Sequence, residues 1–272
     1  MMNKPTLLAV FAHPDDEAFG TGGTLARYAA EGCNVYLVTA TRGEAGEIAP
    51  PSLATPANLP AVREAELRCA CQSYGIHPPI FLDYLDGQLP MVHQGQAVGK
   101  LVRIIRELRP QVLVSFGPEG IYGHYDHLVV HRWASAAYEL AADPDCFPDC
   151  APCQPHQISK FYHRVLHQES LQARNDSGQR AAVLMDGVPF PFVGYPASEI
   201  STVLDVSDFT QQKLQGILCH ATQIGDNSRF VTAPDEMLAD PWFRQETFRL
   251  AATTLQRPDA GETETDLLAG LR

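Results

Sequence analysis

The sequence has 272 residues, of which 45% are hydrophobic and 19% are charged, the balance of an ordinary globular protein. Its 20 basic and 32 acidic residues leave a formal net charge of −12, which disfavours nucleic acid or an anionic membrane surface as a partner. No apolar run approaches the ~20 residues that a membrane helix needs, and the N-terminus shows no signal-peptide pattern. We therefore expect a soluble, cytoplasmic protein without membrane insertion.

Apolar runs alternate with helical patterns through the first half of the chain. They predict strands at 7–12, 35–39, 80–82 and 112–116, and helices at 22–31, 59–74, 95–108 and 126–142. Repeated strand–helix units of this kind predict an α/β fold, a Rossmann-like three-layer α/β/α sandwich with a mostly parallel sheet. In such sheets a ligand binds at the carboxyl ends of the strands.

The pattern changes after residue 143. A Cys- and Pro-rich insertion loop is expected over 143–158, and a structured loop over 187–195. Strands are expected at 160–166 and 201–206 and a helix at 209–218, whereas the pattern beyond 226 is weak. Since neither a repeat nor a long linker is visible, we expect a single domain over 1–272 with an elaborated C-terminal part.

The chain contains seven cysteines, an odd number that cannot be fully paired within one chain. Four of them lie in apolar segments, where we expect small buried side chains of a protein in a reducing compartment: Cys33, Cys69, Cys71 and Cys219. The other three cluster with a histidine and could form a structural zinc site: Cys146, Cys150, Cys153 and His156. The alternative is an exposed loop with free thiols.

A first polar cluster, His13-Pro14-Asp15-Asp16-Glu17, directly follows the first predicted strand. A His and an Asp three positions apart across a tight turn can converge on one divalent ion, and zinc accepts such nitrogen and oxygen ligands. The neighbouring carboxylate could then serve as a general base. The alternative is that Asp15 or Asp16 only caps the following helix.

A second polar cluster follows the fourth predicted strand. Here His124, His127 and His131 are spaced to lie on one helix face, provided that the helix begins early enough. The spacing does not show which of the three would bind a metal. The alternative is a solvent-exposed helix start with Asp126 in its first turn.

A glycine-rich stretch over 20–23 also follows the first strand, as in dinucleotide-binding folds. It does not match the Gly-x-Gly-x-x-Gly pattern, and no acidic residue ends the second strand in the expected place. A non-catalytic nucleotide-binding module is therefore a weak alternative.

Two segments, 12–17 and 123–127, resemble the two signatures of the LmbE-like (PIG-L) zinc-dependent N-deacetylases. Segments 41–47, 63–67 and 86–87 resemble further family loops. Lys213 together with His220-Ala221-Thr222-Gln223 is similar to the branch that acts on mycothiol and its precursor. The sequence departs from the family at Tyr125, where proline is usual.

The resemblance implies a zinc ion, or ferrous iron with the same ligands, bound by His13, Asp16 and His127. Asp15 would be the general base that activates water.

The resemblance also implies that His124 protonates the leaving amine or stabilises the oxyanion, while Asp126 holds its tautomer. Tyr122 would be a second oxyanion donor. Arg63 and Asp86 would line the substrate pocket, although Arg63 could instead pair with a Glu of its own helix and Asp86 could be a turn residue.

These inferences predict a zinc-dependent hydrolase that removes an acetyl group from an N-acetylglucosamine-type substrate. The expected partner is a small N-acyl amino sugar or glycoconjugate, and a homo-oligomer is left open. An alternative with the same metal site is an amidase that cleaves larger thiol S-conjugates.

Overall fold

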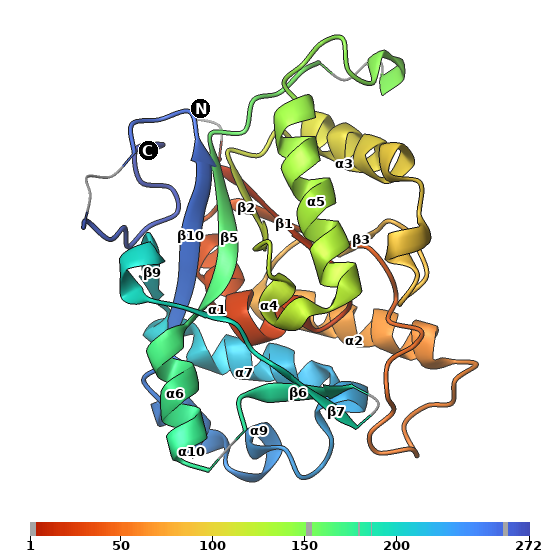
Figure 1. Ribbon diagram of the computed structural model, residues 1–272, viewed down its shortest axis with the longest axis vertical. Coiled ribbons are helices and arrows are strands. Elements are labelled where there is room, and N and C mark those ends of the chain that lie inside the picture. Colours follow the sequence, from red (N-terminus) through yellow and green to blue (C-terminus); the bar gives the residue numbers. More distant parts are fainter. Residues whose placement is uncertain (1–3, 151–153, 179, 186, 258–260) are drawn as a thin grey trace.

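A computed structural model describes residues 4–150, 154–178, 180–185, 187–257 and 261–272 (Figure 1). Eight described strands form one sheet: β1 (Thr6–Phe11), β2 (Asn34–Thr39), β3 (Ile80–Phe81), β4 (Val112–Phe116), β5 (Lys160–His167), β8 (Gly194–Tyr195), β9 (Thr202–Asp205) and β10 (Gln245–Thr253). The order is β3-β2-β1-β4-β5-β10-β9, with β8 beside β5. Strands β1 to β5 pair in parallel, whereas β10 is antiparallel to both of its neighbours.

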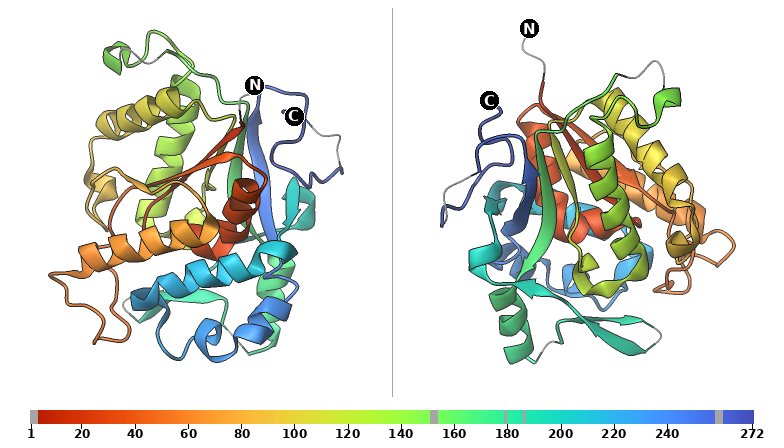
Figure 2. Two further views of the ribbon diagram at one scale, coloured as in Figure 1. Left: turned by 180° about the vertical axis from the view of Figure 1, so that it is seen from behind. Right: turned by 45° about the horizontal axis from the view of Figure 1, so that its top comes forward.

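Helices cover both faces of this sheet. On one face α1 (Asp16–Ala30), α2 (Leu59–Tyr74) and α7 (Thr210–Cys219) pack together, as the view from behind in Figure 2 shows. On the other face α3 (Gln94–Leu108) packs against α5 (Tyr125–Leu140) (Figure 1). The prediction of a three-layer α/β/α fold with a mostly parallel sheet is confirmed. Shorter helices complete the chain: α4 (Gly120–Gly123), α6 (Gln168–Asp176), α8 (Ala221–Ile224), α9 (Arg229–Thr232) and α10 (Pro234–Ala239).

The central strands follow directly from their composition. All six residues of β1 and all five of β4 are buried, because helices cover both faces of the sheet. A strand in this position reads as a continuous apolar run rather than as an alternating one, and this is why both were predictable.

Helix α1 begins six residues earlier than expected, at Asp16, and contains the whole glycine-rich stretch. A Cβ added to Gly20 would lie 1.9 Å from Nε of Arg164, and one added to Gly23 would lie 2.7 Å from Cβ of Val206. These buried glycines let α1 approach its neighbours closely. They do not present backbone to a phosphate, which removes the basis for the nucleotide-binding alternative.

The C-terminal part was predicted least well. Strand β10 lies between β5 and β9 and was not expected, nor was α6. Two short strands lie in the segment expected as a structured loop over 187–195: β7 (Val188–Pro191), which forms a hairpin with β6 (Ala182–Met185), and β8. In β10 the buried positions are Glu246, Phe248 and Leu250, so a buried carboxylate obscures the apolar alternation.

The cysteine expectation needs correction. Cys69 of α2 and Cys219 of α7 form a disulfide with an S–S distance of 2.09 Å, whereas Cys71 is a buried free thiol and Cys33 a partly buried one. These side chains could pair because α2 and α7 lie side by side, which local sequence does not reveal. Within the described ranges, no helix combines the length and apolarity required to cross a bilayer.

Candidate active site

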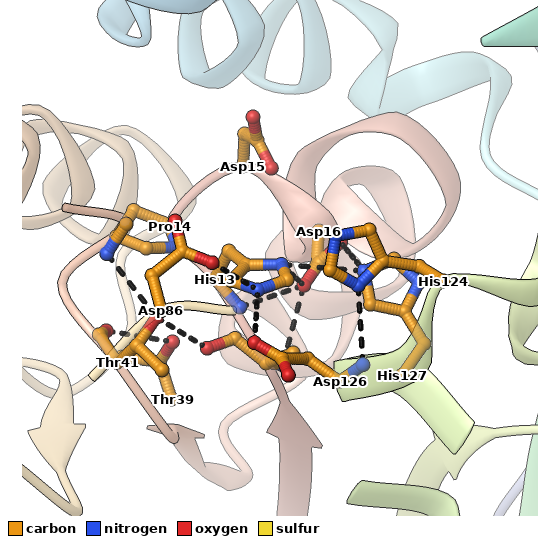
Figure 3. A network of polar contacts seen from close by, with 12 residues as sticks. His13, Pro14, Asp15, Asp16, Thr39, Thr41, Asp86, His124, Asp126 and His127 are labelled. Atoms are coloured by element: carbon orange, nitrogen blue, oxygen red, sulfur yellow. Dashed lines mark hydrogen bonds and ion pairs between the residues drawn. The ribbon is translucent and has the colours of Figure 1, made fainter. Parts of the chain in front are cut away.

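The polar loops after β1, β3 and β4 meet at the carboxyl edge of the parallel sheet. Figure 3 shows how the side chains from these loops face one another. The structure brings together all nine predicted site residues: His13, Asp15, Asp16, Arg63, Asp86, Tyr122, His124, Asp126 and His127.

Three of these side chains converge as the ligands of a metal ion would. Nδ1 of His13 lies 3.5 Å from Oδ2 of Asp16 and 3.3 Å from Nε2 of His127, and that Nε2 lies 3.2 Å from Oδ1 of Asp16. Bonds of about 2.0–2.1 Å in a tetrahedral zinc site place ligand atoms roughly 3.3 Å apart. The spacing and the nitrogen and oxygen donors therefore fit zinc.

Hydrogen bonds fix which ring nitrogens are free. Nε2 of His13 lies 3.0 Å from Oδ1 of Asp86 and 3.2 Å from Oδ2 of Asp126, so a neutral His13 ring carries its proton on Nε2 and has its lone pair on Nδ1. Nδ1 of His127 donates to the carbonyl oxygen of Gly120 at 3.1 Å, which leaves the lone pair on Nε2. Such partners on the far nitrogen are what histidine ligands need to hold their orientation.

The electrostatics of the cluster also favour a cation. Burial disfavours a charged His13 ring, but hydrogen bonds to Asp126, Asp16 and Asp86 outweigh it and raise the pKa of His13 well above its ordinary value. Burial opposes ionisation of Asp16, yet His127 and His13 hold its pKa well below the usual range. Burial likewise opposes ionisation of Asp86, but the His13 hydrogen bond lowers its pKa to about 2. The surrounding carboxylates thus stabilise positive charge at this point.

Asp15 stands apart from the three candidate ligands. Figure 3 shows Asp15 and Asp126 on opposite sides of the His13 ring. The backbone of Asp15 has φ 110°, in the left-handed region that non-glycine residues rarely adopt. Burial raises the pKa of Asp15 to about 6, although the positive charge of Arg63 opposes the shift. A carboxylate of raised pKa next to the candidate ligands in the chain is suited to accept a proton.

Arg63 holds the turn that carries Asp15. Its guanidinium donates to the carbonyl oxygens of Pro14 and Gly43, the latter at 2.9 Å, and Nη2 lies 3.3 Å from Oδ2 of Asp15. Only 3% of Arg63 is exposed, so both terminal nitrogens are occupied within the protein. These contacts give Arg63 a role in holding the turn, and its expected role in lining the substrate pocket stays a prediction.

Asp86 is also engaged by the protein itself. Besides contacting His13, it accepts a hydrogen bond from the backbone N–H of Ala45 at 3.1 Å. Its own N–H donates to Oε2 of Glu44 at 3.1 Å. The loop after β2 therefore orients Asp86 toward His13, and Asp86 does more than form a turn.

Asp126 contacts other groups than expected. Its carboxylate accepts hydrogen bonds from the backbone N–H groups of Gly87 and Leu89, at 2.7 and 3.2 Å, in addition to contacting His13. The backbone N–H of Asp126, and not its side chain, donates to Nδ1 of His124 at 3.2 Å. The tautomer of His124 is thus set by the helix start, because the proton must then lie on Nε2.

His124 and Tyr122 lie beside the candidate ligands. The His124 ring centre is 4.9 Å from that of His13 and 4.8 Å from that of His127. Burial and then these two neighbouring rings lower the pKa of His124 to about 4. The Tyr122 ring lies 5.9 Å from that of His124, and burial raises the pKa of its hydroxyl. Both side chains can act as neutral hydrogen-bond donors.

His131 does not join the cluster, because Nδ1 of its ring donates to the carbonyl oxygen of Phe116 at 3.0 Å. The proposed second metal site lies in part outside the described residues, which omit Cys153 and the side chain of Cys150. Of its other members, His156 donates from Nε2 to the carbonyl oxygen of Pro110 at 2.7 Å. Sγ of Cys146 donates to Asp143 at 3.3 Å.

Four residues of the site's support carry no role in the sequence interpretation. Nε2 of His220 lies 2.8 Å from Oε1 of Glu17. Glu66 accepts hydrogen bonds from the backbone N–H and the hydroxyl of Thr222, at 2.8 and 2.7 Å. The family resemblance includes the segment 220–223 but implies no contact partner for it. The missing signal was a tertiary one, since each pair joins α1 or α2 to the chain after α7.

Comparison with known proteins identifies the family of the chain. The family model "PIG-L: GlcNAc-PI de-N-acetylase" matches residues 8–138. A 1D-myo-inositol 2-acetamido-2-deoxy-alpha-D-glucopyranoside deacetylase of Thermobispora bispora is 37% identical over 265 residues, covering 87% of this chain and 81% of the relative.

Two solved structures share the fold. The N,N'-diacetylchitobiose deacetylase of Pyrococcus horikoshii has a TM-score of 0.69 at 20% identity, covering 91% of this chain and 84% of that one. A 4-carboxy-2-hydroxymuconate hydratase of Pseudomonas putida has a TM-score of 0.65 at 19% identity, covering 93% and 99%. Since the second is a hydratase, the fold alone does not define the reaction. The sequence relationship is decisive, and the chain belongs to the PIG-L family.

Proposed function

We propose that this protein is a zinc-dependent hydrolase that removes the acetyl group from an N-acetylglucosamine-type small molecule. The observation that carries the proposal is the convergence of His13, Asp16 and His127 on one point, with tautomers that leave the facing nitrogens free. The substrate class is supported by the relative from Thermobispora and by the chitobiose deacetylase, both of which are named as deacetylases of N-acetylated amino sugars.

His13, Asp16 and His127 would hold the ion. Zinc, when bound, supplies a Lewis acid that acidifies water and polarises an acyl carbonyl. Ferrous iron suits the same donor set.

The chain's own residues supply the proton transfers. The carboxylate of Asp15 takes a proton from the attacking water as the carbon–oxygen bond forms. Nε2–H of His124 and the hydroxyl of Tyr122 donate hydrogen bonds to the oxygen that becomes negatively charged. When the carbon–nitrogen bond breaks, the amine takes up the proton that Asp15 accepted from water, and acetate and a free amino sugar leave.

Arg63 and Asp86 have a different part in this proposal from the one that the resemblance implied. Arg63 holds the turn of the base, and Asp86 holds the His13 ring. In this proposal both side chains orient other residues of the site, and neither is assigned to sugar binding.

The proposal is tested with purified protein and a panel of N-acetylglucosaminides, with free acetate as the readout. We expect acetate release that stops after chelation and returns with added zinc. The panel includes a thiol S-conjugate, since faster cleavage of that compound would select the amidase alternative. Chelation that leaves acetate release unchanged would contradict the metal assignment.

A further inference from the structure

A buried acid–imidazole pair lies directly behind the proposed base. Glu17 in the first turn of α1 is 1% exposed, and His220, which follows α7, is fully buried. Their side chains meet at 2.8 Å between Oε1 and Nε2, although 203 positions separate them in the chain. Neither residue is a proposed ligand or proton donor, and a buried charged group of this kind needs a reason to be there.

The second oxygen of Glu17 contacts the base residue itself. Oε2 accepts a hydrogen bond from the backbone N–H of Asp15 at 3.0 Å. The carbonyl oxygen of Asp15 accepts from the N–H of Ala18 at 2.9 Å. Asp15 is the residue with φ 110°, a conformation that persists only where the surroundings impose it. Glu17 therefore supplies one of the contacts that hold this backbone in place.

His220 is itself held firmly. Cys219, the residue before His220, forms a disulfide with Cys69 of α2. Thr222, two residues after His220, donates hydrogen bonds to Glu66 of the same helix. Helix α2 also carries Arg63, whose guanidinium contacts the Asp15 carboxylate. Glu17 thus holds the backbone of Asp15, and Arg63 holds its side chain. Arg63 belongs to α2, and Glu17 is connected to α2 through His220 and its disulfide-bonded neighbour Cys219.

We propose that Glu17 and His220 form a positioning unit for the general base. His220 orients the Glu17 carboxylate, and Glu17 holds the strained Asp15 backbone so that its carboxylate faces the attacking water. The pair touches no reacting atom. This inference rests on the proposed function for its kinetic consequence, but its structural consequence does not depend on that function.

The decisive experiment compares His220→Ala in two backgrounds, the native chain and Asp15→Ala. In the native chain we expect kcat for acetate release to fall about 10- to 100-fold, since small misplacements of a catalytic group have effects of this size. KM and bound zinc per chain should stay within about twofold. In the Asp15→Ala background the same change should leave the residual rate unaltered, because the base through which His220 acts is gone.

Conservative replacement supplies the second arm. A glutamine side chain can place its amide N–H near the position of Nε2, so His220→Gln should recover most of the lost kcat. Should His220→Ala fail to fold, Glu17→Gln takes its place, because it keeps only one acceptor oxygen for two donors.

The matched control is His156→Ala, which removes another buried histidine, whose ring makes one hydrogen bond to the described part of the chain, at Pro110. It should lower the melting temperature without lowering kcat. Equal losses from His220→Ala in both backgrounds would show a general structural defect and overturn the proposal.

A crystal structure of His220→Ala separates this inference from the proposed function. We expect Asp15 to leave the left-handed region while His13 and Asp16 stay in place. An unchanged Asp15 backbone would refute the positioning unit even if wild-type protein released acetate. Conversely, a moved Asp15 in a protein that deacetylates no panel member would refute the function and not the unit.

Discussion

Strained residues occur in the loops that build the candidate site. Asp15 after β1 and Ile121 after β4 both have positive φ, 110° and 70°, although neither is a glycine. Such conformations cost about 1–3 kcal/mol each and persist where packing and hydrogen bonds impose them. Asp15 is held by Glu17 and Arg63, and Ile121 is buried beside Tyr122. The site therefore depends on residues that contribute no chemistry of their own.

The roles proposed for His13 and Asp15, which lie in the turn between β1 and α1, can be separated by substitution. His13→Ala should lose both zinc and turnover, because it removes a ligand. Asp15→Ala should keep zinc and lower kcat by about 10²- to 10⁴-fold, the usual contribution of a general base. Metal content per chain and acetate release measure the two effects. Native turnover in Asp15→Ala would rule out its assignment as the base.

Tyr125 shows how a departure from the family pattern can be neutral for the fold. It is the first residue of α5 and 74% exposed, and His124 before it has φ −58° and ψ 127°. Proline suits the first helical position and requires such an extended residue before it. Tyr125→Pro should therefore raise the free energy of unfolding by about 0.4–1 kcal/mol.

Urea unfolding measures the effect of Tyr125→Pro. Arg132→Pro, at an exposed position inside the same helix, should instead cost about 3 kcal/mol or more. If Tyr125→Pro lowered the free energy of unfolding as much as Arg132→Pro, the tyrosine would have a structural role.

At the scale of elements, β10 and α7 are joined to α1 by a buried carboxylate. Glu246 of β10 lies 3.0 Å from Nζ of Lys213 and accepts hydrogen bonds from the backbone N–H groups of Gly23 and Thr24. Burial opposes its ionisation, but the charge of Lys213 and the hydrogen bonds from Thr24 lower its pKa. The strand that the sequence pattern concealed thus connects the two halves of the chain.

This contact makes part of the stability depend on pH. Because the pKa of Glu246 is lower in the folded than in the unfolded state, its contribution is present above the unfolded value of about 4.3. It is lost as pH falls through the lower folded value. Glu246→Gln should cost about 3–5 kcal/mol at pH 7, since it leaves Lys213 buried without a countercharge.

The difference in free energy of unfolding between wild type and Glu246→Gln should shrink as pH falls below about 4, where the wild-type carboxyl also becomes neutral. Urea unfolding at a series of pH values measures it. Glu236→Gln, which breaks an exposed ion pair with Arg229, should cost no more than about 1 kcal/mol. A difference that stays constant with pH would show that charge is not the cause.

At the scale of the whole molecule, the two halves have different tasks. The first half provides the candidate ligands and proton-transfer groups, and the segment 213–223 provides their anchors through Lys213, His220 and Thr222. The disulfide between Cys69 and Cys219 links positions 150 residues apart and closes this arrangement.

A bond that closes so long a loop stabilises mainly by restricting the unfolded chain. Cys219→Ser should lower the free energy of unfolding by about 2–5 kcal/mol. Reductant should destabilise wild type and not the variant, as followed by thermal unfolding. Cys33→Ser, at a free thiol, should have little effect. If wild type had the same melting temperature with and without reductant, this would contradict a contribution of the disulfide to stability.

Local patterns predicted most of the strands and helices of the first half and the two polar clusters, whereas the roles proposed for their residues came from the resemblance to the PIG-L family. Buried parallel strands are continuous apolar runs, and the polar clusters lie in short contiguous turns at the ends of those strands, so both can be located from neighbouring residues alone. They could not reveal β10, whose buried positions include Glu246.

Only the tertiary structure decided how these residues support one another. In the folded chain, Asp86 and Asp126 contact His13, and Glu17 contacts His220. The contact between Asp126 and His124 is made by the backbone N–H of Asp126 and not by its expected side chain. The physical reason is that hydrogen bonds join atoms close in space, whereas these partners lie up to 203 positions apart, and no periodicity relates them.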